Sequence, residues 1–408
     1  MDALPAQVAA RSAKPGGQST RLSFLDGVRA LAALYVVVCH HVTDIQDQMG
    51  STLRHATGWL SYGHYAVDVF IVLSGYCLML PVAKTGGNKL PHGINQYLRA
   101  RALRILPPYF AAVFFSMAVL AFLGRFHELT VGDIVSHLLV IHNFSSHWVY
   151  SINSPLWSVA VEWQIYFTFP LLLLPLRRSF GAVGCILGGL AVGMLPHLFL
   201  PIAWKHHLVP VDWNLDWSYP WYIGLFAMGM IAAEQTYRRM SDAADKSFRR
   251  LLIGFGLAAF ACVALVTLHG GSLVLHSYLV DMAMGAGSAA ILIWCGRHVR
   301  LTEGRRPLLV RLLSSRPLVA LGVMSFSLYL VHQPMWLILD PLVARYSLSV
   351  GQDLAVRLIL GVPVVVALAY IFYLLVERPC LMFRARVTAV SSLPTALNSP
   401  PETAAAAS

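Results

Sequence analysis

Charged residues are scarce in this chain. Asp, Glu, Lys and Arg make up 12% of its 408 residues, whereas soluble globular domains carry about 25%. Hydrophobic residues make up 57% and the mean hydropathy is +0.64. This composition excludes a single large soluble core and indicates a protein that crosses a membrane several times.

Several familiar signatures are also missing. The chain has no Walker loop, no dinucleotide-binding glycine fingerprint, no HExxH and no GxSxG element, which removes several enzyme classes. Its six cysteines lie in or beside apolar stretches without paired spacing, so neither a disulfide framework nor a metal site is expected. The N-terminal residues lack an early apolar stretch, so no cleaved signal peptide is expected.

The positive charge of the chain is distributed as in a membrane protein. A net charge of +11 could suggest nucleic acid, but the basic residues fall in short clusters between apolar blocks. With the N-terminus inside, 25 of the 30 Lys and Arg residues would face the cytoplasm and 5 the outer side. This asymmetry is the usual mark of cytoplasmic loops and makes the lipid bilayer, not nucleic acid, the expected partner.

The apolar stretches predict an all-α integral membrane protein, a bundle of about ten transmembrane helices with both termini in the cytoplasm. The predicted domain spans 21–386, between disordered tails at 1–20 and 387–408. A short helix is expected within 131–142, in the longest outer loop. The ten predicted spans are 24–43, 66–83, 105–123, 164–176, 182–201, 220–236, 251–268, 276–296, 317–339 and 353–376.

Arg29 and His40 are the first candidate site residues. They are eleven positions apart, so on a helix they share one face to within about 20° and their Cα atoms are about 16 Å apart. An arginine and a histidine inside a membrane are unfavourable unless they line a polar cavity. His40 could act as a general base on a hydroxyl or only hydrogen-bond near the headgroups, and position alone leaves both open. His41 points about 100° away and is expected to be structural.

Arg101 and Arg104 share a helix face three positions apart at the end of a predicted inner loop. Arginine recognises phosphate through two parallel hydrogen bonds, so this pair could hold a nucleotide-bearing donor. A plain positive flank of a membrane span is the alternative, and the sequence pattern by itself favours that alternative.

Four more polar residues are candidates for substrate contacts. Ser158 and Glu162 lie one helical turn apart on one face. Asp68 opens the second span, where an interfacial acid is an equal possibility. His332 lies deep in the ninth predicted span, either lining the same cavity or bonding to a neighbouring helix.

Six motifs occur in order and together resemble the acyltransferase family 3 membrane proteins, which O-acylate polysaccharides, peptidoglycan and small molecules. The resemblance covers about residues 21–386. The motifs are LDG with the Arg29-to-His40 spacing, VDVFIVLSG, the RxxR at Arg101 and Arg104, SPLWSVAVEWQIYF, SFSLYLVHQP and ERP.

The resemblance implies a role for each matching residue. His40 matches the essential histidine of the family and Arg29 its partner arginine. Arg101 and Arg104 match the cytoplasmic arginine pair of the family. Ser158 and Glu162 match its serine–glutamate motif. The usual donor of the family is acetyl-CoA, and its acceptors are often modified on the outer side. Departures at Ile71, Ala66 and Trp163 touch none of these groups.

The sequence is therefore interpreted as an O-acetyltransferase of the bacterial plasma membrane that moves an acetyl group from acetyl-CoA to a hydroxyl of a glycan. Catalysis is assigned to His40 as general base with Arg29 and Glu162, and donor binding to Arg101 and Arg104. Substrate contacts are assigned to Asp68, Ser158 and His332. No permanently bound cofactor and no metal are expected. Alternatives are acylation of a small hydroxylated metabolite on the cytoplasmic side, or a transporter without chemistry.

Overall fold

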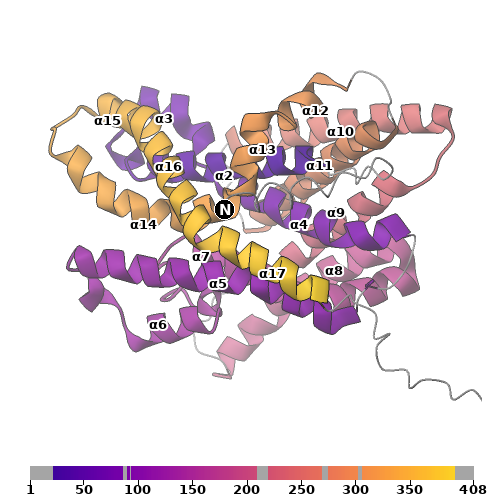
Figure 1. The fold of residues 1–408 in the computed structure, drawn as a ribbon, viewed down its shortest axis with the longest axis horizontal. Helices are drawn as coiled ribbons and strands as arrows, with labels where there is room; N and C mark the ends of the chain where they lie inside the picture. Colours follow the sequence, from indigo (N-terminus) through magenta and orange to yellow (C-terminus); the bar gives the residue numbers. More distant parts are fainter. Residues whose placement is uncertain are drawn as a thin grey trace, which may run out of the picture.

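The computed structural model describes residues 22–85, 90–91, 93–208, 219–268, 274–301 and 306–390. Within these residues every regular element is a helix and no strand occurs (Figure 1), which confirms the all-α prediction. The predicted tails lie outside the described residues, except that the last helix continues to Val390.

Seven helical stretches in the described part of the chain are long and apolar enough to cross a membrane, and a bent pair brings the number to eight. The bent pair is α13 (Arg316–Val323) with α14 (Ser325–Ala344), which meet at 69°. Five of the seven are single helices: α2 (Phe24–Thr43), α4 (His64–Thr85), α5 (Gly93–Phe122), α10 (Asp242–Leu268) and α11 (Val274–Leu301). The sixth consists of α7 (Leu156–Thr168) and α8 (Leu174–Lys205), joined by η5 (Phe169–Leu173). The seventh consists of α15 (Val350–Val356), α16 (Val362–Phe372) and α17 (Arg378–Val390), joined by η6 (Arg357–Gly361) and η7 (Tyr373–Glu377).

The predicted number of ten spans is thus not confirmed. Two predicted spans, 164–176 and 182–201, lie on one continuous helical stretch that bends at Gly181, whose φ is 70°. A third, α9 (Tyr222–Tyr237), has 16 residues, whereas a straight span needs about 20. Hydropathy locates apolar segments but does not show whether a bend separates them.

Helix α2 occupies the middle of the bundle (Figure 1). It packs against α4, α13, α14 and the short helix α12 (Leu308–Leu313). Apolar residues such as Ala33 and Val37 are fully buried there. Its polar residues therefore face other helices rather than lipid.

Helices α4 and α9 approach each other backbone to backbone. A Cβ atom at Gly75 of α4 would lie 2.1 Å from a carbonyl oxygen of α9, and one at Gly229 of α9 would lie 2.0 Å from a carbonyl oxygen of α4. Only glycine permits this contact. Gly75 and Gly229 therefore serve the packing of α4 on α9.

Between α5 and α7 the chain forms a folded loop that contains α6 (Val131–Leu138), so the short helix expected here is present. Thr130 caps α6 through a reciprocal pair of hydrogen bonds with Asp133. Beneath it the rings of His137 and His142 are buried and stacked, with centroids 3.9 Å apart. The loop thus forms a packed unit at one end of the bundle.

Candidate active site

A polar cavity of about 120 Å³ lies where α2, α4, α5, α7 and α14 meet. Five of the predicted site residues line it, which brings together positions up to 133 residues apart in sequence. Its polar lining consists of Arg29, Ser74, Cys77, Arg101, Arg104, Ser158, Glu162, Tyr166, Ser325 and Tyr329.

The two arginines of α5 bring uncompensated charge to this cavity. Among the described residues neither Arg101 nor Arg104 has a hydrogen bond or an ion pair, and the Nε atom of Arg101 is buried without a partner. Two acids act on this charge at longer range: Glu162 lines the same cavity, and the carboxylate of Glu377 in η7 lies in the field of Arg104. Glu377 itself accepts hydrogen bonds from the backbone N–H and hydroxyl of Ser327, at 3.1 and 2.6 Å. Guanidinium groups left in this condition favour an anionic ligand.

Arg29 is held in a fixed orientation from two sides. Its Nη1 donates to Asp26 at 3.1 Å, one turn earlier on α2, and its Nη2 donates to the Cys77 sulfur at 3.0 Å. One acid thus compensates part of its charge. The contact with Cys77 joins α2 to α4 across the cavity floor.

Glu162 is anchored to its own helix. It accepts a hydrogen bond of 2.5 Å from the hydroxyl of Tyr166, which in turn accepts one of 3.2 Å from Ser74. No hydrogen bond joins Glu162 to His40 among the described residues. Of the two roles considered for Glu162, this arrangement fits contact with a substrate in the cavity better than contact with the histidine.

Ser158 leads from the cavity toward His40. Its hydroxyl lies 2.6 Å from that of Tyr329, and both hydroxyls donate to the carbonyl oxygen of Pro155. The Tyr329 ring is 5.9 Å from the His332 ring, and the His332 ring is 5.2 Å from that of His40. A continuous row of polar side chains therefore runs from α7 over α14 to the end of α2.

His332 is fixed in one tautomer by its backbone contacts. Its Nδ1 lies 2.8 Å from the carbonyl oxygen of Tyr329, so Nδ1 carries the proton and the buried Nε2 is a bare acceptor. The ring of His40 makes no hydrogen bond with any described residue and is partly exposed. His41 instead packs its buried ring on Trp336, at 4.2 Å between centroids. Of the two neighbours, His40 is the one available to accept a proton.

Three predicted site residues do not line the cavity. His40 and His332 lie at the end of the row of polar side chains, whereas Asp68 lies elsewhere. It is fully buried on the opposite face of α4, beside Tyr222 and Asp281. Asp281 accepts a hydrogen bond of 2.9 Å from Trp221. The sequence could not reveal this, because the rotation of α4 relative to its neighbours decides which face meets the cavity.

A larger opening continues the cavity toward the end of the bundle where α4 ends and α5 begins. It has a volume of about 680 Å³ and shares Cys77, Leu78, Arg101 and Arg104 with the inner cavity. Arg384 of α17 adds a third arginine to its wall. By the distribution of basic residues, this end is the predicted cytoplasmic end.

Three functional candidates escaped the sequence reasoning: Glu377, Tyr166 and Tyr329. A signal existed for Glu377, since an acid within an apolar span points to a functional site by default. The two tyrosines carried none, because tyrosine is common in membrane helices. In the described part of the chain no group of three or more His, Cys, Asp or Glu residues gathers as a metal site would require.

Comparisons with known proteins show what the whole chain is similar to. A family model described as an acyltransferase domain matches residues 22–374. YrhL of Bacillus subtilis, a candidate peptidoglycan O-acetyltransferase, is 27% identical over 87% of this chain and 54% of its own length. The acyltransferase MdmB of Streptomyces mycarofaciens is 26% identical over 76% of this chain and 78% of its own.

A third relative is the peptidoglycan O-acetyltransferase OatA of Listeria monocytogenes, 23% identical over 87% of this chain and 55% of its own length. The chain thus spans about half the length of the two peptidoglycan relatives. No solved structure matches the chain.

Proposed function

Because the chain belongs to acyltransferase family 3, we propose that it is a multi-pass O-acetyltransferase of the bacterial plasma membrane. It transfers an acetyl group from acetyl-CoA to a hydroxyl of a carbohydrate acceptor. Two of the relatives named above carry peptidoglycan O-acetyltransferase in their names, which supports a glycan as the acceptor.

The observation that carries the donor assignment is the charge of the two connected cavities. Arg101 and Arg104 have no partner among the described residues and lie where the inner cavity meets the wider opening, beside Arg384. The phosphates of CoA would supply the missing negative charge at this point. The acyl arm would then extend past Arg29 toward Tyr329 and the histidines.

The chemistry follows from the row of polar side chains. His40 accepts the proton of the acceptor hydroxyl, whose oxygen attacks the thioester carbonyl carbon. The hydroxyls of Ser158 and Tyr329 are 2.6 Å apart. One of them turns its proton from the carbonyl oxygen of Pro155 to the oxyanion that develops on the thioester carbonyl. The C–S bond then breaks and CoA leaves, taking up the proton that His40 accepted. His332 positions His40 through their ring contact.

The test is acetyl transfer by the purified protein in lipid nanodiscs. Radiolabelled acetyl-CoA is supplied with a panel of sugar acceptors and small hydroxylated molecules, and both transfer and thioester hydrolysis are measured. The proposal expects labelled ester on a sugar. Folded protein that neither transfers acetyl nor consumes the thioester refutes the CoA-dependent reaction and favours the transporter alternative.

A further inference from the structure

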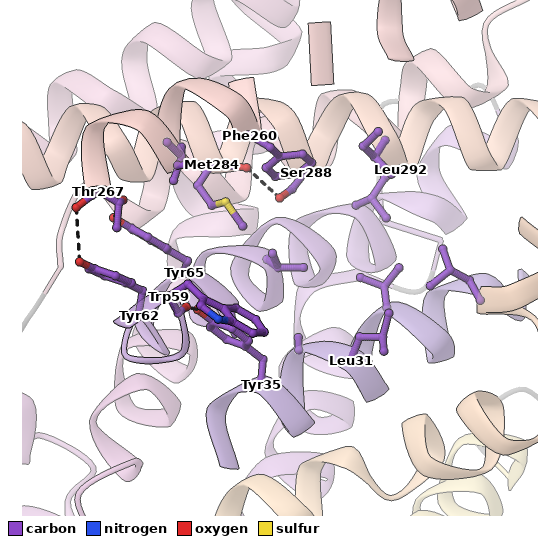
Figure 2. Close-up of a pocket in the computed structure, with 18 of the residues that line it drawn as sticks. Leu31, Tyr35, Trp59, Tyr62, Tyr65, Phe260, Thr267, Met284, Ser288 and Leu292 are labelled. Atoms are coloured by element: carbon purple, nitrogen blue, oxygen red, sulfur yellow. Dashed lines mark hydrogen bonds between the residues drawn. The ribbon is translucent and has the colours of Figure 1, made fainter. Parts of the chain in front are cut away.

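A second hollow, of about 520 Å³, is lined by other faces of α2 and α4 than the polar cavity and shares no residue with it. Figure 2 shows residues that line this groove. Helices α10, α11 and α12 complete its walls. Residues 28, 31, 32 and 35 of α2 line it at helical spacing. Tyr35 points about 140° away from His40, so α2 and α4 form the wall between the two spaces.

This groove changes character from one end to the other. Leu31 and Leu292 lie toward one end, where the lining is aliphatic (Figure 2). Midway along the groove, the hydroxyl of Ser288 donates a hydrogen bond of 2.7 Å to the carbonyl oxygen of Met284. Most of the groove therefore offers no free polar group to a ligand.

The opposite end is built of four aromatic side chains with polar atoms, Tyr35, Trp59, Tyr62 and Tyr65, here termed the aromatic end (Figure 2). The rings of Tyr62 and Tyr65 stack 5.6 Å apart, and the Tyr65 hydroxyl lies 2.9 Å from the hydroxyl of Thr267. Trp59 is 61% exposed. The hydroxyls of Tyr35 and Tyr62 donate to the carbonyl oxygens of Trp59 and Thr267, so this end offers a ligand aromatic faces and hydroxyl oxygens that can accept hydrogen bonds. Such a surface suits a ligand that is apolar on one side and hydroxylated on the other.

The dimensions correspond to one leaflet of a bilayer. The lining runs from Met284 to Leu292 on α11, about 12 Å along the axis, against about 15 Å for half the hydrocarbon thickness. Leu31 is 48% exposed and Ala264 is also exposed, so the groove opens sideways to lipid. His40 lies beyond Tyr35 by about 7.5 Å along α2, toward the aromatic end.

An apolar channel open to lipid, with hydroxylated aromatics at the end nearest the catalytic histidine, fits an amphiphile in one orientation only. We propose that the groove holds the hydrocarbon chain of a lipid whose sugar headgroup extends past the aromatic end and over the end of α2 to the partly exposed ring of His40, where it is the acyl acceptor. This inference rests on the proposed function and names its acceptor class as a lipid-linked sugar. The sugar oxygen forms the new ester with the acyl carbon, the thioester C–S bond breaks, and CoA leaves with the proton relayed by His40.

The experiment compares two acceptors with the same sugar, dodecyl β-glucoside and methyl β-glucoside, in nanodiscs with labelled acetyl-CoA. The dodecyl compound should have a KM lower by about tenfold or more, because its chain occupies an apolar site. Partition into the bilayer also concentrates the dodecyl compound, so the decisive comparison is between variants. Ala264→Trp fills the groove from α10, and Ala258→Trp places the same bulk on the exposed opposite side of that helix.

Ala264→Trp should remove most of the advantage of the dodecyl compound, while hydrolysis of acetyl-CoA and transfer to methyl β-glucoside stay unchanged. Ala258→Trp should behave as wild type. A dodecyl glucoside with a diazirine in its chain should crosslink to α10 and α11 in wild type and in Ala258→Trp, but not in Ala264→Trp.

Two outcomes overturn the inference while leaving the proposed function intact: equal KM values for the two glucosides in wild type, or unchanged dodecyl transfer in Ala264→Trp. The second would make the groove a site for bulk lipid only. Absence of transfer and of thioester consumption in every variant would instead refute the proposed function, and the crosslinking pattern would still report on the groove.

Discussion

Replacing Arg101 and Arg104 together by alanine should abolish tight binding of CoA. Neither guanidinium has a hydrogen bond or ion pair among the described residues, so the substitution removes no such contact from the folded protein. A hydrogen bond to a charged group contributes about 1.5–3 kcal/mol, so losing one phosphate contact per arginine removes roughly 3–6 kcal/mol. The dissociation constant should then rise by about 10²- to 10⁴-fold.

The assay is isothermal titration of CoA into protein in nanodiscs. Arg99→Ala is the matched control, because Arg99 lies on the same helix, is exposed and lines neither cavity. Lysine at both positions should recover only part of the affinity, since an ammonium cannot make the two parallel hydrogen bonds of a guanidinium. A double alanine variant that binds CoA as well as Arg99→Ala would refute the reasoning and leave the pair as an ordinary positive flank.

Three further outcomes are expected. His40→Ala should lower acetyl transfer by about 10²- to 10⁴-fold with CoA binding retained, and His41→Ala should keep much of the activity; normal turnover in His40→Ala would contradict the assignment of the base. Gly75→Ala places a Cβ 2.1 Å from a carbonyl oxygen of α9 and should destabilise the protein by about 1–3 kcal/mol in thermal unfolding, whereas Gly254→Ala, which meets nothing within 4 Å, should be neutral. Burial lowers the pKa of His137 from 6.5 to about 4, so between these pH values the unfolded state binds more protons than the folded state. The melting temperature should therefore fall as the pH drops from about 6.5 to about 4. The fall should be shallower in His137→Phe, which has no imidazole to protonate.

Spacing within one helix was predictable from the sequence, whereas the number of spans was not. Helix α2 begins and ends where the apolar pattern placed it, at Phe24 and Thr43. The eleven-residue spacing predicts that Arg29 and His40 lie on one face of α2. In the structure Arg29 lines the polar cavity, and His40 lies beside His332 at the end of the row of polar side chains. Spacing within one helix is fixed by helical geometry, so sequence alone reveals it.

The sequence does not reveal how the helices are placed and rotated against one another. The face of Asp68 depends on how α4 is rotated against α9, and the partner of Glu162 depends on the rotamer of Tyr166. The groove with the aromatic end is assembled from five helices, none of which carries a motif for it. The cytoplasmic location of the termini, argued from basic residues, stays a prediction.

The central position of α2 has a consequence for how the chain is made. This helix is the least apolar of the seven membrane candidates, with a mean hydropathy of 1.3, yet it leaves the ribosome first. Its partners α13 and α14 follow about 290 residues later. At about 5–20 residues per second, they emerge roughly 15–60 s after it.

During that interval Arg29 and His40 lack the neighbours that later enclose them, and a polar side chain in lipid is unfavourable. We therefore expect α2 to reach its final depth only when the C-terminal third of the chain has been inserted. Chains truncated before α13 should then leave α2 accessible to degradation, and α2 would report whether α13 and α14 have been inserted.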